Sequence, residues 1–328
     1  MEYREIGNTG IKVSVIGLGS WPMGGLVGGV IGETKKVQKA GWSGAVDEES
    51  IRTIRKAEEL GINFVHSSEI YGGGHAEAII GQALIDRRDR FVIATKVRPV
   101  MEGTNPDAAR RRIREALEGS LRRLQTDYVD IHQLHSFPNE NTTSAVMDEY
   151  EKLKQEGKVR HVAISATDPD RISDLRAHGE IVAMMFGYNM LSPAKPQAFE
   201  LAQQENLGTV ILSSLASGIL SGKWFGKVPD IDPMDKRYAS FTSPEAVAAL
   251  EKLKELEFLT HDDSRTMAQA AFRFILDTPG VTSILTGALR PSEIEENVGA
   301  LDTPPLTDDE LSRIGEITAA ANEIWRGG

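Results

Sequence analysis

Short apolar runs of strand-like composition alternate with amphipathic stretches of helical period along almost the whole chain. The strand-like runs lie at 13–18, 62–66, 91–95, 128–134, 159–164, 181–186, 209–213 and 282–285. The helical patterns lie near 48–60, 76–87, 105–124, 142–156, 168–178, 194–206 and 264–277. Such alternation is typical of βα units that build a parallel sheet. Because eight strands follow in this order, the sequence predicts an α/β fold, a closed (β/α)8 TIM barrel, in preference to an open doubly wound sheet.

The two ends of the sequence add smaller elements to this barrel. Two short strand-like runs, 3–7 and 11–14, flank the turn sequence Asn8-Thr-Gly10, which predicts a β-hairpin across the base of the barrel. After Pro304, Thr307-Asp-Asp-Glu310 reads as a capping box ahead of an apolar stripe and predicts another helix. A typical barrel has about 250 residues and accepts insertions. No linker or composition shift divides this chain, so one domain spanning 1–328 is expected.

The overall composition excludes several classes of function. The net charge of −11 argues against a general nucleic-acid binder, because such proteins neutralise phosphates with a basic surface. The chain has no cysteine, so disulfides, thiolate zinc sites and cysteine nucleophiles are excluded, and no residue is assigned to a metal. No apolar stretch is long enough to span a bilayer, and the first residues lack the apolar core of a signal peptide. A cytoplasmic protein without a membrane segment is therefore expected.

The predicted helix 105–124 is crowded with arginines, and a basic run can mark a phosphate or nucleic-acid surface. These arginines are Arg110, Arg111, Arg112, Arg114, Arg122 and Arg123. Glu115 and Glu118 alternate with them at helical spacing. We therefore expect ion pairs between residues i and i+4 along a solvent-exposed helix face.

Tyr71, Lys96 and His135 each follow one of three successive predicted strands. The C-terminal ends of barrel strands converge on one mouth, so these side chains are expected to meet there. A hydride that attacks a carbonyl leaves negative charge on the oxygen, which a proton donor must neutralise. The charge of Lys96 would lower the pKa of Tyr71, and His135 would donate a hydrogen bond to the same oxygen. Together the three residues predict a proton-donating site for carbonyl reduction.

The motifs that carry these residues are similar to those of a known family. They are Gly61-Ile-Asn-Phe-Val ahead of Tyr71, Ala94-Thr-Lys96, and Asp127-Tyr-Val-Asp-Ile-His-Gln-Leu-His135. Together with the opening residues 3–20, they resemble the aldo-keto reductase family. The resemblance implies a barrel that reduces a small aldehyde or ketone by hydride transfer from NADPH, with Tyr71 as the proton donor.

The resemblance extends to the segments that bind the cofactor in this family. The run Leu285-Thr-Gly-Ala-Leu-Arg-Pro-Ser-Glu-Ile-Glu-Glu-Asn297 is similar to the adenosine-phosphate segment, where Arg290 would pair with the ribose 2′-phosphate and Asn297 would meet the adenine. Leu220-Ser-Gly-Lys223 looks like the loop that closes over the pyrophosphate. The cofactor-binding residues implied in this way are Ser165, Ser213, Leu215, Gly222, Lys223, Gly287, Arg290, Glu296 and Asn297. The implied cofactor is NADP(H), with NADH less expected.

A glycine-rich run, Gly24-Gly-Leu-Val-Gly-Gly-Val-Ile-Gly32, follows the first predicted strand. It lacks the Gly-Lys-Ser/Thr ending of a P-loop, and Gly17-Leu-Gly19 lacks the third glycine of a Rossmann fingerprint. We expect 24–32 to form a mobile loop at the barrel mouth. The segment 22–46 is longer than the resemblance would suggest at this point, and we expect it to contribute to the substrate pocket.

Four positions that would surround the nicotinamide depart from the family pattern. His66 stands where the family usually has an aspartate, and Met185 where it usually has a glutamine. Ala166 replaces the asparagine that commonly follows Ser165, and the run 211–214 has neither the aromatic residue nor the arginine often found there. Removing one partner of a buried ion pair typically costs about 3–5 kcal/mol. Without the aspartate, Lys96 is therefore expected to lose its positive charge near neutral pH.

These departures leave two classes of enzyme open. The first is an NADPH-dependent reductase, in which Glu69 is a candidate to replace the missing carboxylate beside Lys96. The second is a repurposed barrel in which His66, Tyr71, Lys96 and His135 carry out acid-base chemistry such as elimination, isomerisation or epimerisation. A non-enzymatic sensor of nicotinamide cofactor is a third, less favoured class. The sequence specifies neither the substrate, the reaction direction nor the oligomeric state.

Overall fold

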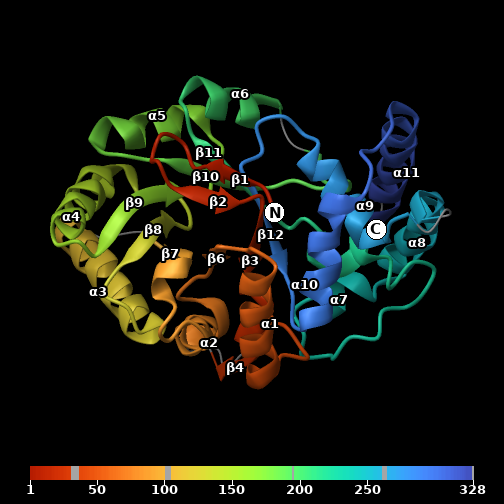
Figure 1. Ribbon diagram of the computed structural model, residues 1–328, viewed down its shortest axis with the longest axis horizontal. Coiled ribbons are helices and arrows are strands. Elements are labelled where there is room, and N and C mark those ends of the chain that lie inside the picture. Colours follow the sequence, from red (N-terminus) through yellow and green to blue (C-terminus); the bar gives the residue numbers. More distant parts are fainter. Residues whose placement is uncertain (31–36, 100–104, 194–195, 261–263, 327–328) are drawn as a thin grey trace.

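The computed structural model describes residues 1–30, 37–99, 105–193, 196–260 and 264–326. At its centre, parallel strands close into a barrel and follow one another around it in chain order (Figure 1). These strands are β3 (Ile16–Gly19), β6 (Phe64–His66), β7 (Val92–Val97), β8 (Val129–Leu134), β9 (Val159–Ile164), β10 (Ala183–Gly187), β11 (Gly208–Leu212) and β12 (Ser283–Gly287). The predicted (β/α)8 barrel is therefore confirmed, and each predicted strand range overlaps one barrel strand.

Helices cover the outside of the barrel (Figure 1). Those that follow the strands are α1 (Asp47–Glu59), α2 (His75–Ala83), α3 (Pro106–Leu124), α4 (Thr143–Gln155), α5 (Pro169–His178), α6 (Pro196–Gln204), α9 (Met267–Leu276) and α10 (Pro291–Val298). Three more are α7 (Tyr238–Phe241), α8 (Pro244–Leu253) and α11 (Asp308–Arg326). Residues of α7, α8, α9 and α11 form a second apolar cluster, separate from the main core between strands and helices. The sequence patterns did not predict α7 and α8.

Local signals account for where two of the helices begin or end. The predicted capping box is present ahead of α11: the Thr307 N–H donates to Glu310 Oε2 at 2.7 Å, and the Glu310 N–H donates to Thr307 Oγ1 at 3.2 Å. Each bond satisfies an amide that the first turn of a helix leaves unpaired. The predicted helix 76–87 is too long. The helix α2 ends at Ala83, and Asp86 adopts a left-handed φ of 63° through which a helix cannot continue.

The first residues close one end of the barrel. β1 (Tyr3–Glu5) pairs antiparallel with β2 (Lys12–Ser14), which confirms the predicted hairpin. Ile6 and Val13 have no exposed surface and pack with interior side chains of the barrel strands. Gly7 lies against backbone atoms that immediately precede β10 and β11. The hairpin therefore forms a floor at the N-terminal ends of the strands and leaves the C-terminal ends as the mouth.

A second hairpin follows β3 at the mouth. β4 (Leu26–Val30) pairs antiparallel with β5 (Val37–Gly41), and both strands pack against the turn 71–74. The predicted loop 24–32 is therefore wrong for residues 26–30, which form a strand, and residues 31 and 32 lie outside the described residues. The contact with the turn agrees with the expectation that 22–46 borders the substrate pocket, which stays a prediction.

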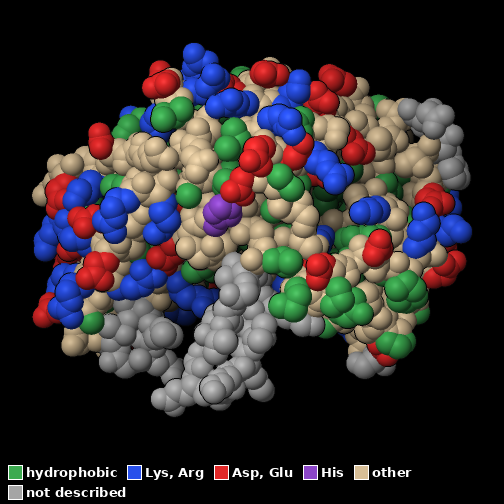
Figure 2. Space-filling model, turned by 90° about the horizontal axis from the view of Figure 1, so that it is seen from below, with side chains coloured by type: hydrophobic (Ala, Val, Ile, Leu, Met, Phe, Trp, Pro, Cys, Tyr) green, Lys and Arg blue, Asp and Glu red, His purple; other side chains and the backbone are tan. Residues whose placement is uncertain are grey.

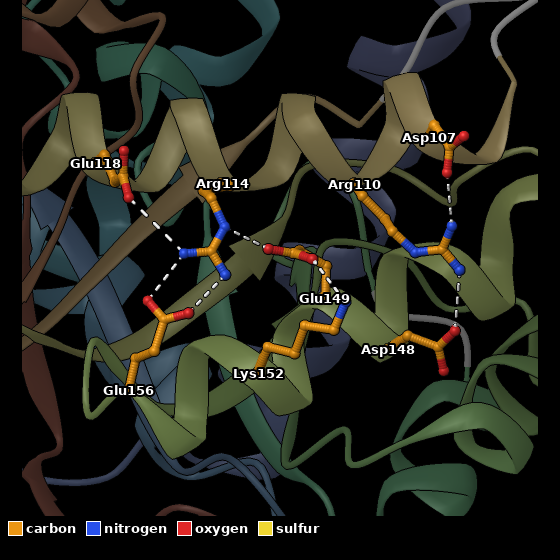
Figure 3. Close-up of polar contacts among 8 residues, drawn as sticks. All are labelled: Asp107, Arg110, Arg114, Glu118, Asp148, Glu149, Lys152 and Glu156. Atoms are coloured by element: carbon orange, nitrogen blue, oxygen red, sulfur yellow. Dashed lines mark hydrogen bonds and ion pairs between the residues drawn. The ribbon is translucent and has the colours of Figure 1, made fainter.

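Two arginines of α3, Arg110 and Arg114, pair with acids on or next to α4 (Figure 3). Arg114 donates through Nε to Glu149 and through Nη1 and Nη2 to Glu156, at 2.6 to 2.8 Å. Its i,i+4 contact with Glu118 is longer, at 3.8 Å. Arg110 likewise reaches an acid on α4. The predicted i,i+4 pairing is therefore present in the Arg114–Glu118 contact, but the shorter bonds of Arg114 go to acids that the neighbouring helix brings within reach.

The described surface offers no membrane span or metal cluster. None of the described helices is long and apolar enough to cross a bilayer. Over the same residues, no group of three or more His, Asp or Glu side chains is arranged to hold a metal ion. On the face shown in Figure 2, basic and acidic side chains are intermingled, so this face carries no continuous basic surface.

Candidate active site

Tyr71 begins a tight 3-10 turn, Tyr71–Gly74, after β6. Gly72 and Gly73 both have φ of 62°, and Gly74 has φ of 97°. Residues other than glycine rarely adopt such backbone angles. Gly24 and Gly72 also lie backbone to backbone, so a Cβ on either residue would collide with the other. The glycines therefore fix the course of the chain that presents Tyr71 at the mouth.

Lys96, on β7, lies beside Tyr71 as predicted. Its Nζ donates a hydrogen bond to Tyr71 Oη at 2.5 Å, and only 3% of Lys96 is exposed. Burial lowers the pKa of Lys96 to about 7. Burial also raises the pKa of Tyr71 above its ordinary value. The prediction that Lys96 lowers the pKa of Tyr71 is therefore wrong for this state of the protein: burial disfavours both charged forms, so at pH 7 Tyr71 is protonated and Lys96 carries its charge about half of the time.

His135 follows β8 and completes the group. Its ring lies edge-on to the Tyr71 ring, with centroids 6.5 Å apart. Burial, together with the charges of Lys96 and Arg98, lowers the pKa of His135 to about 4. The imidazole is therefore neutral at physiological pH. Its Nδ1 is buried with no hydrogen-bond partner among the described residues. Such a ring can donate a hydrogen bond to a ligand oxygen without bringing a charge.

His66 ends β6 and is 2% exposed. Its Nε2 lies 3.3 Å from Gln133 Oε1, and Gln133 Nε2 donates to Met185 Sδ at 3.3 Å. Because the glutamine amide donates toward the sulfur, its oxygen faces His66, which assigns the ring proton to Nε2. Burial, then the charge of Lys96, lower the pKa of His66 well below its ordinary value. His66 is therefore neutral and supplies no counter-charge to Lys96.

Glu69 does not take the place of the missing carboxylate. Its Oε1 accepts hydrogen bonds from the Arg98 backbone N–H, at 3.0 Å, and from the Arg112 guanidinium. Among the described residues, no ion pair joins Glu69 to Lys96. The prediction of Glu69 as a substitute is therefore wrong, because Arg112 of α3 holds its carboxylate elsewhere.

The expected cofactor residues near the nicotinamide lie at the ends of β9 and β11. Ser165 is half-buried and its N–H donates to the Leu134 carbonyl at 2.8 Å. Ser213 is exposed, Leu215 half-buried, and Ser213 has a left-handed φ of 58°. Ala216 and Ser217 are also left-handed, with φ of 46° and 59°. Such angles cost about 1–3 kcal/mol each and gather at ligand sites.

The expected pyrophosphate loop ends in a glycine that the fold requires. Gly222 has φ of 78° and lies close to the side chain of Met267. Lys223 is exposed, with its Nζ 5.7 Å from the centroid of Trp224. The lysine is therefore accessible beside the left-handed backbone that follows β11.

The expected adenosine residues lie at the end of β12 and on α10. Gly287 is exposed and packs against Pro22. Arg290 is exposed at the N-cap of α10, and Glu296 is exposed on the helix. Asn297 is buried, and its Nδ2 donates to Thr286 Oγ1 at 2.7 Å. The Asn297 amide group is thus anchored to β12.

An aromatic wall that sequence reasoning missed stands beside Tyr71. It consists of Trp21, stacked on Tyr71 with ring centroids 6.0 Å apart, and Trp42, edge-on to Trp21 at 5.5 Å. Trp21 follows β3 directly, so its place at the end of a barrel strand was an available signal. Trp42 had none, because it lies beyond the β4–β5 hairpin.

One cleft in the described part of the chain lies away from this site. A cleft of about 340 Å³ opens where the loop after β8 meets α5, and its lining includes Phe137, Arg171 and His178. It contains none of Tyr71, Lys96 or His66, so the catalytic assignment rests on side-chain geometry at the mouth.

Comparisons with known proteins agree with this geometry. A family model described as the aldo/keto reductase family matches residues 34–319. The aldo-keto reductase YhdN of Bacillus subtilis is 30% identical over 310 residues, covering 90% of this chain and 87% of YhdN. The NADH-specific methylglyoxal reductase of Escherichia coli is 29% identical over 346 residues, covering 98% of this chain and 99% of that protein. The holo form of aldo-keto reductase AKR11C1 from Bacillus halodurans superposes with a TM-score of 0.72 at 26% identity, over 97% of this chain and 96% of that one. Because the matched span includes the strands that present Tyr71, Lys96 and His135, the chain belongs to the aldo/keto reductase family.

Proposed function

We propose that the protein is an NADPH-dependent reductase of aldehydes or ketones in which Tyr71 donates the proton. The observation that carries the proposal is the 2.5 Å contact between Lys96 Nζ and Tyr71 Oη, buried at the barrel mouth beside His135. Family membership supports an oxidoreductase that acts on a small carbonyl compound. The non-redox alternative receives no comparable support, since the named relatives above are reductases.

The residues at the mouth suit such a reaction. NADPH, when bound, supplies the hydride that converts the carbonyl carbon to an alcohol carbon. Tyr71 retains its proton because burial raises its pKa, and it gives that proton to the oxygen as negative charge develops there. Lys96 donates a hydrogen bond to Tyr71 Oη and stabilises the phenolate that remains. Neutral His135 orients the carbonyl oxygen by a hydrogen bond.

The expected cofactor residues fit a dinucleotide phosphate. Three residues after β11, Ser213, Ala216 and Ser217, have left-handed φ angles, and such strained backbone gathers at ligand sites. Lys223 and Arg290 are exposed and can each reach a phosphate. In the proposal, Ser165, Ser213 and Leu215 border the nicotinamide, Gly222 and Lys223 the pyrophosphate, and Gly287, Arg290, Glu296 and Asn297 the adenosine phosphate. Because one relative is NADH-specific by name, the preference for NADP(H) requires its own test.

The proposal is tested by NADPH oxidation with a panel of aldehydes and ketones. Tyr71→Phe should lower kcat by about 10²- to 10⁴-fold, the usual contribution of a positioned proton donor. Its Kd for NADPH should change little. Tyr128→Phe is the matched control, because Tyr128 precedes β8 at the opposite end of the barrel, where its ring lies between Arg88 and Arg160. Equal turnover by Tyr71→Phe and the unmodified protein, or no NADPH oxidation with any carbonyl, would overturn the proposal.

A further inference from the structure

A lysine at the mouth, Lys236, covers one ring of the aromatic wall. Lys236 Nζ lies 3.8 Å from the centroid of the Trp21 ring, and Trp21 in turn stacks on Tyr71. The Lys236 N–H donates to the Gly41 carbonyl at 3.2 Å, which ties this segment to the end of β5. Within the described ranges, no carboxylate forms an ion pair with Lys236. Its ammonium therefore stands two contacts away from the proposed proton donor.

The neighbouring acid, Asp235, offsets the charge of this lysine only in part, because its oxygens are already engaged. Asp235 is fully buried and accepts from Arg237 Nε and Nη2 at 2.9 and 2.8 Å. It also accepts from the Ser43 N–H and Oγ at 2.7 and 2.8 Å. The Arg237 guanidinium in turn lies 3.7 Å from the centroid of the Trp42 ring. Asp235 and Arg237 thus form an ion pair whose two charges act on Lys236 in opposite directions, so the pair leaves no net negative charge beside the lysine.

A second cation reinforces the positive field at this site. Arg98 follows β7, is exposed, and lies near enough to His135 for its charge to lower the pKa of that ring. The carboxylate of Glu69 does not offset this positive charge, because it forms an ion pair with Arg112. Lys236 and Arg98, neither of which forms an ion pair among the described residues, thus place positive charge near the proposed donor in a chain whose net charge is −11. Such a field raises the local concentration of anions.

We propose that Lys236 binds an anionic group, a carboxylate or a phosphate, on the carbonyl substrate while the carbonyl oxygen lies at Tyr71. This inference rests on the proposed reductase function and narrows its substrate class to anionic aldehydes or ketones. Trp21 would support the body of the substrate, and the ammonium above its ring would receive the charged end. Burial lowers the pKa of Lys236, so its ammonium is partly desolvated and gains from an anion more than a solvated lysine would.

The test compares carbonyl compounds that differ in one charged group. Two pairs serve: 4-carboxybenzaldehyde with benzaldehyde, and glyceraldehyde 3-phosphate with glyceraldehyde. The unmodified protein should favour the charged member of at least one pair in kcat/KM, mainly through KM. In Lys236→Met this ratio should fall by about tenfold to a hundredfold, the range for losing a hydrogen bond to a charged group. Lys236→Arg should restore most of the ratio. Lys227→Met is the matched control, since Lys227 is an exposed lysine of the same segment between β11 and α7, and no contact joins it to the aromatic wall among the described residues.

Binding measurements keep this inference separate from the reductase proposal. Isothermal titration of the same aldehydes and of NADPH is carried out with each variant. If no carbonyl is turned over, the reductase proposal fails, whereas a charge preference in binding that Lys236→Met removes still supports the anion site. If Lys236→Met leaves the charged-to-neutral ratio unchanged, the inference is overturned. Weaker NADPH binding in Lys236→Met with an unchanged substrate ratio also overturns it, since the lysine then serves a cofactor phosphate.

Discussion

Among the described residues, no carboxylate forms an ion pair with Lys96 beside Tyr71, and His66 stands at the position where the resemblance implied an aspartate. The imidazole is neutral, and Gln133 and Met185 hold it in place. With no carboxylate beside it, Lys96 has a pKa of about 7. At neutral pH, Lys96 is therefore uncharged in roughly half of the protein molecules. If the ammonium form is the active one, activity is present below that pKa and declines as pH rises through it.

Restoring the carboxylate should shift this pH dependence. In His66→Asp the pKa of Lys96 should rise, because an adjacent anion favours the ammonium, and the decline in kcat should move to higher pH. Turnover at pH 8 should increase severalfold. The profiles of kcat between pH 5 and 9 measure this. His66→Asn is the control for side-chain size without charge. Superimposable profiles for all three proteins would mean that His66 does not influence the proton donor.

Arg290 carries the expected preference for NADP(H). It is exposed at the start of α10, and a guanidinium there can contact the 2′-phosphate, which NADH lacks. Arg290→Ala should raise the Kd for NADPH about tenfold or more and leave the Kd for NADH unchanged. Titration of both cofactors measures the two constants. Arg55→Ala, on the exposed face of α1, is the control. Equal affinities of the unmodified protein for NADPH and NADH would contradict the preference.

At the scale of elements, strand ends were predictable and side-chain partners were not. Alternating patterns located all the barrel strands, and parallel strands necessarily bring Tyr71, Lys96 and His135 to one mouth. The partner of Glu69 and the raised pKa of Tyr71 escaped prediction. Both depend on how deeply α3 and the mouth residues are packed, which no local pattern encodes.

The turn that carries Tyr71 offers a test at this scale. Gly72→Ala should displace the turn, because the added Cβ collides with the Gly24 backbone and φ is left-handed. Turnover should fall at least tenfold, and the melting temperature should drop by several degrees. Gly73→Ala is the matched control: its φ is the same, but a Cβ there has nothing within 4 Å. Equal losses in both variants would show that the backbone angle, and not the contact with Gly24, positions Tyr71.

At the scale of the whole molecule, the mouth is assembled from segments far apart in the chain. Ser43 and Asp235, which join the aromatic wall to the segment before α7, are 192 residues apart. Periodicity and capping signals describe neighbours in sequence, so they predict the barrel and its hairpin but not this contact. The same limit explains why Trp42 and Lys236 were absent from the predicted site.

The hairpin β1–β2 closes one end of the barrel strands and leaves the other end open for the candidate site. At the floor, Ile6 and Val13 are sealed in, and Asp130 accepts from both Arg88 and Arg160. The opposite ends of the strands carry the candidate site, with His66 at the end of β6 and Lys96 near the end of β7. Folding and chemistry thus draw on opposite ends of each strand. In a chain built in this way, residues at the mouth can change to fit a new substrate while the packing at the floor, and the stability that it contributes, is retained.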